Sequence, residues 1–170
     1  MKINGRTILK RLYGIKRFGN RLSRFRHFRG HGVHSPFVYS IVREVFMHPE
    51  VDVDDKLFLT MVDAEIPYKR AVQLRKLVEH CNYSRVGINC EVDGYDFVVF
   101  TADFPTERLA DVVSNARNCG TTLAIMAPYA NSGRDKVCRM IVETHRSTTI
   151  DNRGYLLVFN NHLPKQHFKL

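Results

Sequence analysis

Residues that could hold an anion gather around the stretch FRGHGVHSPFVYSIV, residues 28–42. Ser35 followed by Pro36 favours a helix start, because the Ser hydroxyl can accept a hydrogen bond from a free backbone NH and Pro has no NH to satisfy. We therefore predict a helix from Pro36 to about Met47, whose free N-terminal NH groups could bind an anion. The candidate residues are Arg29, His31, His34 and Ser35. Alternatively, the histidines bond backbone carbonyls and fix a bend, which is the usual role of isolated histidines there.

The basic residues are concentrated at the N-terminus. Ten of the 26 Lys and Arg residues lie between Lys2 and Arg29, and the first acidic residue is Glu44. Without residues 1–31 the chain has 16 basic and 17 acidic residues, so the net charge of +9 belongs to this arm. Hydrophobic residues recur in the arm at steps of three and four, which predicts an amphipathic helix with a basic face.

The basic face of the arm has several interpretations. It could be simply solvated, bind nucleic acid or another acidic partner through residues 2–29, or lie peripherally on an anionic membrane. From Arg17 to Arg29 every basic residue except His27 is an arginine, whose forked donors favour phosphate recognition. The candidate contact residues are Arg17, Arg21, Arg24, Arg26 and Arg29.

Length and composition predict a soluble globular protein. A chain of 170 residues with 44% hydrophobic and 25% charged residues can form one domain with a core. We expect an arm at 1–31, a helical region at 32–82 and an α/β core at 83–170. The chain has no CxxC pair, no apolar secretion signal and no long apolar span. These features predict a cytoplasmic protein with reduced thiols and no metal site.

Short apolar runs alternate with helix-like segments in the second half of the chain. The runs are RVGINC, YDFVVF, TTLAIMA and YLLVFN, and the helices are expected at Thr106 to Ala116 and Arg134 to Glu143. This alternation predicts a mainly parallel sheet covered on both faces. The last two strands, STTI and GYLLVF, are joined by a tight turn and should be antiparallel. Ser132 and Asp135 form a capping-box pair at the second helix.

Two further helices are expected before the sheet. One is short, around Asp55 to Val62, and the other follows Pro67 and ends near Asn82.

The segments GHGVHSPFVYSIV, LRKLVEHCNYSRVGI, YDFVVFTADF and TIDNRGYLLVFNNHLPKQHFKL cover much of the chain. Together they resemble a family of bacterial class I methyltransferases that use S-adenosylmethionine. The resemblance implies a Rossmann-like fold with strand order three, two, one, four, five, seven, six. It also implies that HGVHSPF is the junction between basic N-terminal helices and the catalytic domain.

The chain departs from this family where the cofactor would bind. In the family, the first strand runs into a glycine-rich turn, and an acidic residue after the second strand holds the ribose. Here SRVGINC is followed almost at once by EVDGYDFVVF, which resembles the fourth strand. Two strand and helix units of roughly 30 residues each are missing, a deletion of about 60 residues. The expected fold is therefore α/β, a truncated Rossmann-like sheet of order one, four, five, seven, six.

Few residues remain for methyltransferase chemistry. The cofactor-binding candidates are Gly87, Glu91 and Asp93, and the catalytic candidate is Asp103, which is also placed to cap a helix starting at Pro105. Family members carry two aspartates after the fifth strand, where this chain has Ala127 and Pro128.

We therefore expect a methyltransferase-like protein that has lost S-adenosylmethionine binding and catalysis. It would need no cofactor and would act as a binding or regulatory module through its basic arm. One alternative is an active methyltransferase whose pocket is completed by a dimer or a partner. Another is a nucleic-acid-binding protein.

The deletion would also leave the strand Arg85–Asn89 at an edge of the sheet. Because an uncovered apolar edge invites pairing, we predict either a homodimer through this strand or a cover formed by the N-terminal helices.

Overall fold

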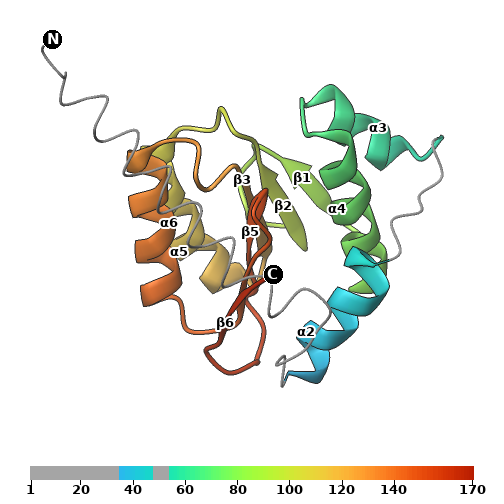
Figure 1. The fold of residues 1–170 in the computed structure, drawn as a ribbon. Coiled ribbons are helices and arrows are strands. Elements are labelled where there is room, and N and C mark those ends of the chain that lie inside the picture. The colour runs from blue at the N-terminus through green and yellow to red at the C-terminus, as the bar shows by residue number, and fades with distance from the viewer. Residues whose placement is uncertain (1–34, 48–53) are drawn as a thin grey trace, which may run out of the picture.

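The computed structural model describes residues 35–47 and 54–170. Six short strands form one mixed sheet, with helices on both of its faces (Figure 1). The strands are β1 (Val86–Ile88), β2 (Phe97–Phe100), β3 (Thr122–Met126), β4 (Thr149–Asp151), β5 (Tyr155–Val158) and β6 (His167–Lys169).

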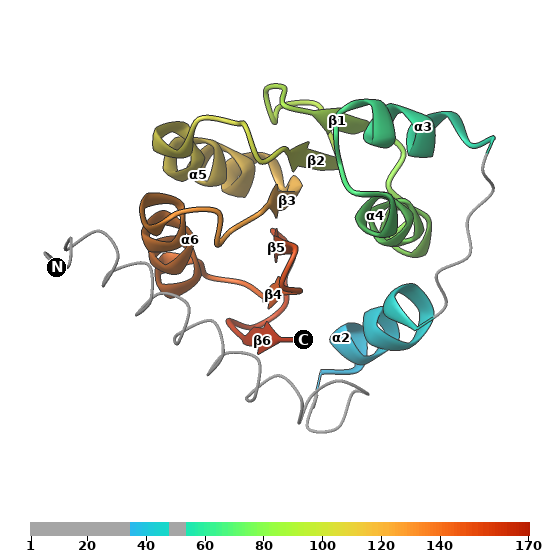
Figure 2. The ribbon, with the colours of Figure 1, turned by 45° about the horizontal axis from the view of Figure 1, so that its top comes forward.

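The helices form two layers around the sheet. They are α2 (Pro36–Ile41), continued by a π-helical turn at Val42–Phe46, α3 (Lys56–Asp63), α4 (Tyr68–His80), α5 (Leu109–Cys119), preceded by a 3-10 turn at Thr106–Arg108, and α6 (Ser132–Thr144). Figure 2 shows α5 and α6 on one face of the sheet and α2 and α4 on the other. The chain is therefore an α/β protein of three layers.

The strands lie in the order β1-β2-β3-β5-β4-β6. β1, β2 and β3 are parallel, and β5 runs antiparallel to both of its neighbours, β3 and β4. The five expected strands thus have the expected spatial order, and the antiparallel final hairpin is confirmed. β6 was not expected. It pairs with β4 in parallel and forms the second edge of the sheet.

The sheet separates two hydrophobic cores, and successive side chains of a strand pack alternately into one and the other because they point to opposite faces. In β2, Phe97 and Val99 pack with α2, α3 and α4, whereas Val98 and Phe100 pack with α5 and α6. All four side chains are fully buried. A strand buried on both faces has to be apolar throughout, which explains the continuous apolar runs of the sequence.

Two expected helix caps are wrong. α6 is capped by Asn131, whose side chain accepts a hydrogen bond from the Arg134 NH at 2.9 Å, and Ser132 is already helical. Asp103 does not cap the 3-10 turn, which starts at Pro105 without a side-chain cap. Ser35 does cap α2, since its hydroxyl accepts a hydrogen bond from the Val38 NH at 3.4 Å.

β1 lies at an edge of the sheet, as expected from the sequence. Its side chains Val86 and Ile88 are half-buried against the core on the α4 side, and Gly87 is buried. Pairing of this edge with a second copy stays a prediction. No helix in the described ranges has the length and apolar character needed to cross a membrane.

Candidate functional site

A cleft of about 360 Å³ lies at the carboxyl ends of β2 and β3. It is bounded by the loop that enters α4 and by the turn that enters β5. Its lining includes the apolar residues Ile66, Ala102, Met126, Ala127 and Ala130 and the cationic residues Lys69, Arg70 and Arg153. In open α/β sheets, the carboxyl ends of parallel strands are the usual place for a ligand. The cleft is therefore the candidate functional site.

The backbone around the cleft is strained. Five non-glycine residues of the described chain have a positive φ, and three of these line the cleft: Glu65 (60°), Ala127 (46°) and Arg153 (50°). The left-handed region costs a residue with a Cβ about 1–2 kcal/mol. Strain of this kind is concentrated at functional sites, where the surrounding structure holds it in place.

Arg70 is fixed at the edge of the cleft by close packing against the turn before β5. A Cβ on Gly154 would lie only 2.4 Å from Arg70 Nε, so this approach requires a glycine. Arg70 Nη1 also donates to Gln73 Oε1 at 2.8 Å, and the guanidinium lies 5.6 Å from the centre of the Tyr155 ring. The guanidinium is therefore held in position before any ligand arrives.

Buried Asp151 holds the turn that carries Arg153. Asp151 is only 2% exposed, and its carboxylate accepts hydrogen bonds from the Arg153 NH at 3.1 Å and from the Tyr129 hydroxyl. Tyr129 and Asp151 also line a second cleft, of about 250 Å³, between α6 and the strands β4 and β6.

Arg134 closes the other side of the strand ends. Arg134 is only 1% exposed, and its guanidinium donates to the carbonyl oxygens of Phe104 (2.8 Å), Thr101 (2.9 Å) and Met126 (3.0 Å). Burial lowers the pKa of Arg134, whereas the nearby Cys138 and Asp103 raise it. Because Thr101 and Met126 line the cleft, Arg134 fixes the position of its floor.

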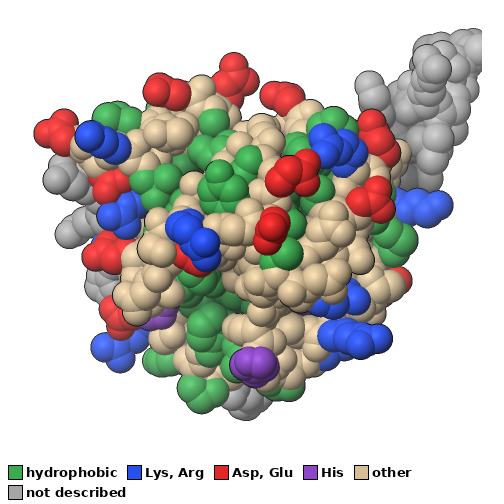
Figure 3. Space-filling model, turned by 180° about the vertical axis from the view of Figure 1, so that it is seen from behind, with side chains coloured by type: hydrophobic (Ala, Val, Ile, Leu, Met, Phe, Trp, Pro, Cys, Tyr) green, Lys and Arg blue, Asp and Glu red, His purple; other side chains and the backbone are tan. Residues whose placement is uncertain are grey.

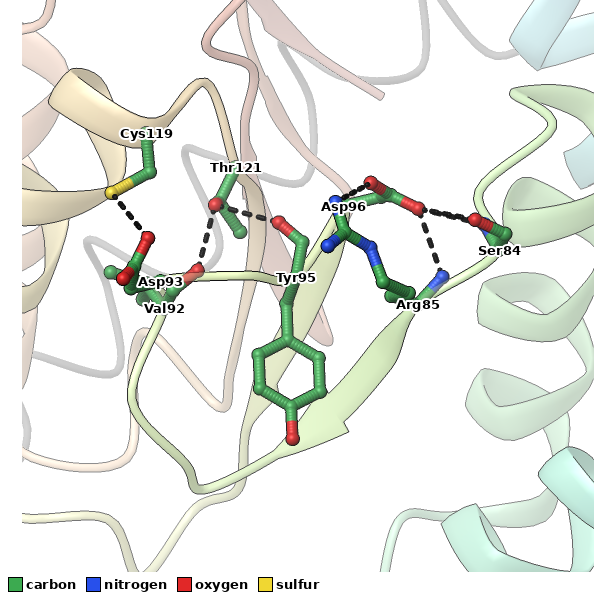
Figure 4. A network of polar contacts seen from close by, with 8 residues as sticks. All are labelled: Ser84, Arg85, Val92, Asp93, Tyr95, Asp96, Cys119 and Thr121. Carbon is green, nitrogen blue, oxygen red and sulfur yellow. Dashed lines mark hydrogen bonds and ion pairs between the residues drawn. The ribbon is translucent and has the colours of Figure 1, made fainter.

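The connection between β1 and β2 has only eight residues, 89–96, and is held by its own polar contacts (Figure 4). The Asp96 carboxylate accepts hydrogen bonds from the backbone NH groups of Arg85 and Ser84, both at 2.9 Å, and from the Ser84 hydroxyl at 2.8 Å. The bond from the Arg85 NH, followed by those from Ser84, holds the pKa of Asp96 far below its usual range. These bonds join the segment before β1 to the start of β2.

The middle of this connection is fixed by α5 and β3. Between these elements, the Thr121 hydroxyl contacts the carbonyl oxygens of Val92 at 2.9 Å and Tyr95 at 2.8 Å (Figure 4). At its start, Asn89 Nδ2 donates to Thr101 Oγ1 at 2.8 Å, and Asn89 Oδ1 accepts from the Thr101 NH at 2.9 Å. The Asn89 side chain thus ties the carboxyl ends of β1 and β2 together.

The three cofactor-binding candidates are not brought together. A Cβ on Gly87 would lie 2.2 Å from Cys90 Sγ and 3.1 Å from the Tyr95 ring, so side chains of this chain already fill the space beside it. Glu91 forms an exposed ion pair with Arg108 at 3.4 Å, and Asp93 lies 3.7 Å from Cys119 Sγ. Asp93 lines an open surface pocket with Gly94 and Asp96, whereas Gly87 and Glu91 do not line it, so the three candidates do not form one cofactor site.

Asp103 and Ser35, the two remaining sequence candidates that the structure describes, do not line the cleft. Asp103 is exposed. Ser35 is buried and caps α2, which has only six residues. The other candidates fall outside the described residues: Arg17, Arg21, Arg24, Arg26, Arg29, His31 and His34. Sequence reasoning missed Lys69 and Arg70, which are adjacent in the chain, and Arg153, which lies more than 80 residues away and meets them only through the sheet topology.

Both signs of charge are mixed on the face that Figure 3 shows, around a central strip of hydrophobic side chains. This agrees with the near balance of acidic and basic residues outside the arm. The four cysteines are free thiols.

The fold and the site define an α/β protein with a cleft at the carboxyl ends of two parallel strands in a mixed sheet. Comparison with family models, curated proteins and solved structures gives no match.

Proposed function

We propose that this chain is a methyltransferase-like protein that has lost S-adenosylmethionine binding and catalysis and acts as a binding module. The proposal rests on the resemblance of its sequence to class I methyltransferases and on the strand order of its sheet. In the family, the acidic residue that holds the ribose follows the second strand, which a shortened sheet in that order lacks.

The observation that carries the proposal is the eight-residue connection between β1 and β2. At the start of this connection, the Asn89 side chain forms hydrogen bonds with Thr101, beyond the end of β2. At the end of the connection, the Asp96 carboxylate accepts a hydrogen bond from the Arg85 NH. Since Cys90 and Tyr95 occupy the space beside Gly87, the backbone there has no open face for a cofactor. A methyltransferase needs such a face and a carboxylate for the ribose.

A calorimetric titration of the full chain with S-adenosylmethionine and S-adenosylhomocysteine tests the loss of the cofactor. We expect no heat of binding at millimolar ligand. A dissociation constant in the micromolar range would overturn the proposal and favour the alternative, an active methyltransferase.

The partner of this module would be bound by the arm at residues 2–29, which carries ten of the basic residues and no acidic one. Nucleic-acid binding is the second candidate function, and the five arginines from Arg17 to Arg29 favour it. Neutralising several phosphates releases counterions, so affinity for a single-stranded RNA or a DNA duplex should fall steeply with salt. Affinity that is independent of salt would exclude this candidate.

A further inference from the structure

We propose that the cleft at the carboxyl ends of β2 and β3 binds a small organic anion, with an acidic group held by Lys69 and Arg70 and an apolar body against Met126 and Ala127. The acidic group is a carboxylate or a phosphate ester. This inference goes beyond the loss of S-adenosylmethionine binding and does not depend on it, because the ligand needs no nucleoside.

The charge around the cleft favours an anion. Lys69, Arg70 and Arg153 contribute three positive charges to its lining, and Glu65 contributes the single negative charge. Arg70 is already positioned by Gly154 and Gln73, so little of its side-chain entropy would be lost on binding. Its planar donors suit a carboxylate or a phosphate ester.

The size and the floor of the cleft favour an organic ligand over an inorganic ion. The volume of about 360 Å³ is within the usual range for small-molecule sites, whereas a free phosphate would fill only a part of it. The same cleft is also lined by the apolar residues Ala102, Met126, Ala127 and Ala130. A ligand that buries apolar area here and pairs its charge at the rim satisfies both parts of the lining.

The strained backbone supports a built site. Ala127, at the end of β3, and Arg153, in the turn before β5, both have a left-handed backbone, and the Ala127 NH donates to the Gly154 carbonyl at 2.8 Å. This bond joins the two strained segments at one side of the cleft. Ala127 and Arg153 both line the cleft.

The test uses NMR titrations of the full chain with phenyl phosphate and benzoate as probes and benzyl alcohol and inorganic phosphate as controls. Methyl signals of Ala102, Met126 and Ala127 report on the cleft. We expect saturable shifts of these signals with at least one of the two aromatic anions, and markedly weaker binding of benzyl alcohol and of inorganic phosphate.

Variants separate the parts of the proposal. Lys69→Gln should weaken binding of the aromatic anion about fivefold to tenfold, because one charge near the acidic group is lost. Lys136→Gln removes an exposed lysine of α6 outside the cleft and should leave affinity unchanged. Gly154→Ala should also weaken binding, because the added methyl group would push the Arg70 guanidinium out of its position. The three atoms nearest to the methyl group would all be side-chain atoms of Arg70, so the backbone should keep its conformation.

Three results would overturn the proposal: no saturable shift with either aromatic anion, equal affinity for benzyl alcohol, or equal weakening by Lys69→Gln and Lys136→Gln. Inorganic phosphate that binds as tightly as phenyl phosphate would also overturn it, because the apolar floor would then contribute nothing. Both lysine variants change exposed side chains, so a loss of folding does not obscure the comparison.

Discussion

Arg134→Met should destabilise the protein strongly, because the Arg134 guanidinium joins α6 to the ends of two strands. Its partners are the carbonyl oxygens of Thr101, Phe104 and Met126. Methionine fills a similar length but removes the hydrogen bonds that these carbonyls accept from the guanidinium, at about 1–3 kcal/mol for each buried group. The Thr101 carbonyl keeps the Phe104 NH as a donor at 3.3 Å. Relief of the desolvation of a buried charge offsets a part of this cost. We expect a net loss of about 3–5 kcal/mol in the free energy of unfolding.

Urea denaturation followed by circular dichroism measures this loss. With a slope of about 2 kcal/mol per molar urea, the unfolding midpoint should fall by about 1.5–2.5 M. Lys136→Met, on an exposed position of the same helix, is the matched control and should change stability by less than about 0.5 kcal/mol. A midpoint for Arg134→Met within about 0.5 M of the unaltered protein would refute the reasoning, since the three carbonyls would then find other partners.

Three other changes have defined outcomes. His145 is 1% exposed and its Nε2 donates to the Phe159 carbonyl at 2.7 Å, and burial lowers its pKa below the unfolded value near 6.5. The contribution of neutral His145 to stability is therefore fully present above pH 6.5 and is lost as the pH falls below that value. The urea midpoint of the unaltered protein should drop from about pH 7.5 to about pH 5, and it should drop less in His145→Gln. Equal dependence of the two midpoints on pH would contradict this. Asp96→Asn should lower the free energy of unfolding by about 1 kcal/mol, because the three bonds to Oδ2 lose the charge of their acceptor and an amide NH2 group cannot accept the Arg85 Nη2 bond to Oδ1 at 3.3 Å. An unchanged urea midpoint would argue against the network. Ala127→Gly should raise stability by about 0.5–1 kcal/mol by relieving a φ of 46°, and a lower melting temperature would show that no strain is stored there.

The strands and most helices could be predicted because their signals are local. Apolar runs such as FVVF and TLAIM mark strands buried on both faces, and Ser35 followed by Pro36 marks a helix start. β6 gave no such signal, since only Phe168 of its three residues is apolar and both neighbours are exposed. The cap of α6 was displaced by one residue because Asn131 and Ser132 are both good caps, and only the backbone decides between them.

The cleft could not be predicted because its residues carry no local pattern. Lys69 and Arg70 lie in the first turn of α4, where exposed cations are ordinary, and Arg153 lies in a hairpin turn more than 80 residues away. Only the path of the chain through the four strands β1 to β4 brings them to the same end of the sheet. The left-handed backbone of Ala127 has no signal in its side chain.

Residues 89–96 form a short connection fixed between β1 and β2 rather than a loop around a nucleoside. Amide hydrogen exchange of the full chain, with and without millimolar S-adenosylhomocysteine, tests it most directly. The Asn89, Asp96 and Phe97 NH groups donate to the carbonyls of Val99, Arg85 and Arg85 at 2.9, 2.9 and 3.2 Å. We predict slow exchange of these amides in the free protein and no change on addition of the ligand. Rapid exchange in the free protein, followed by protection when S-adenosylhomocysteine is added, would contradict the account.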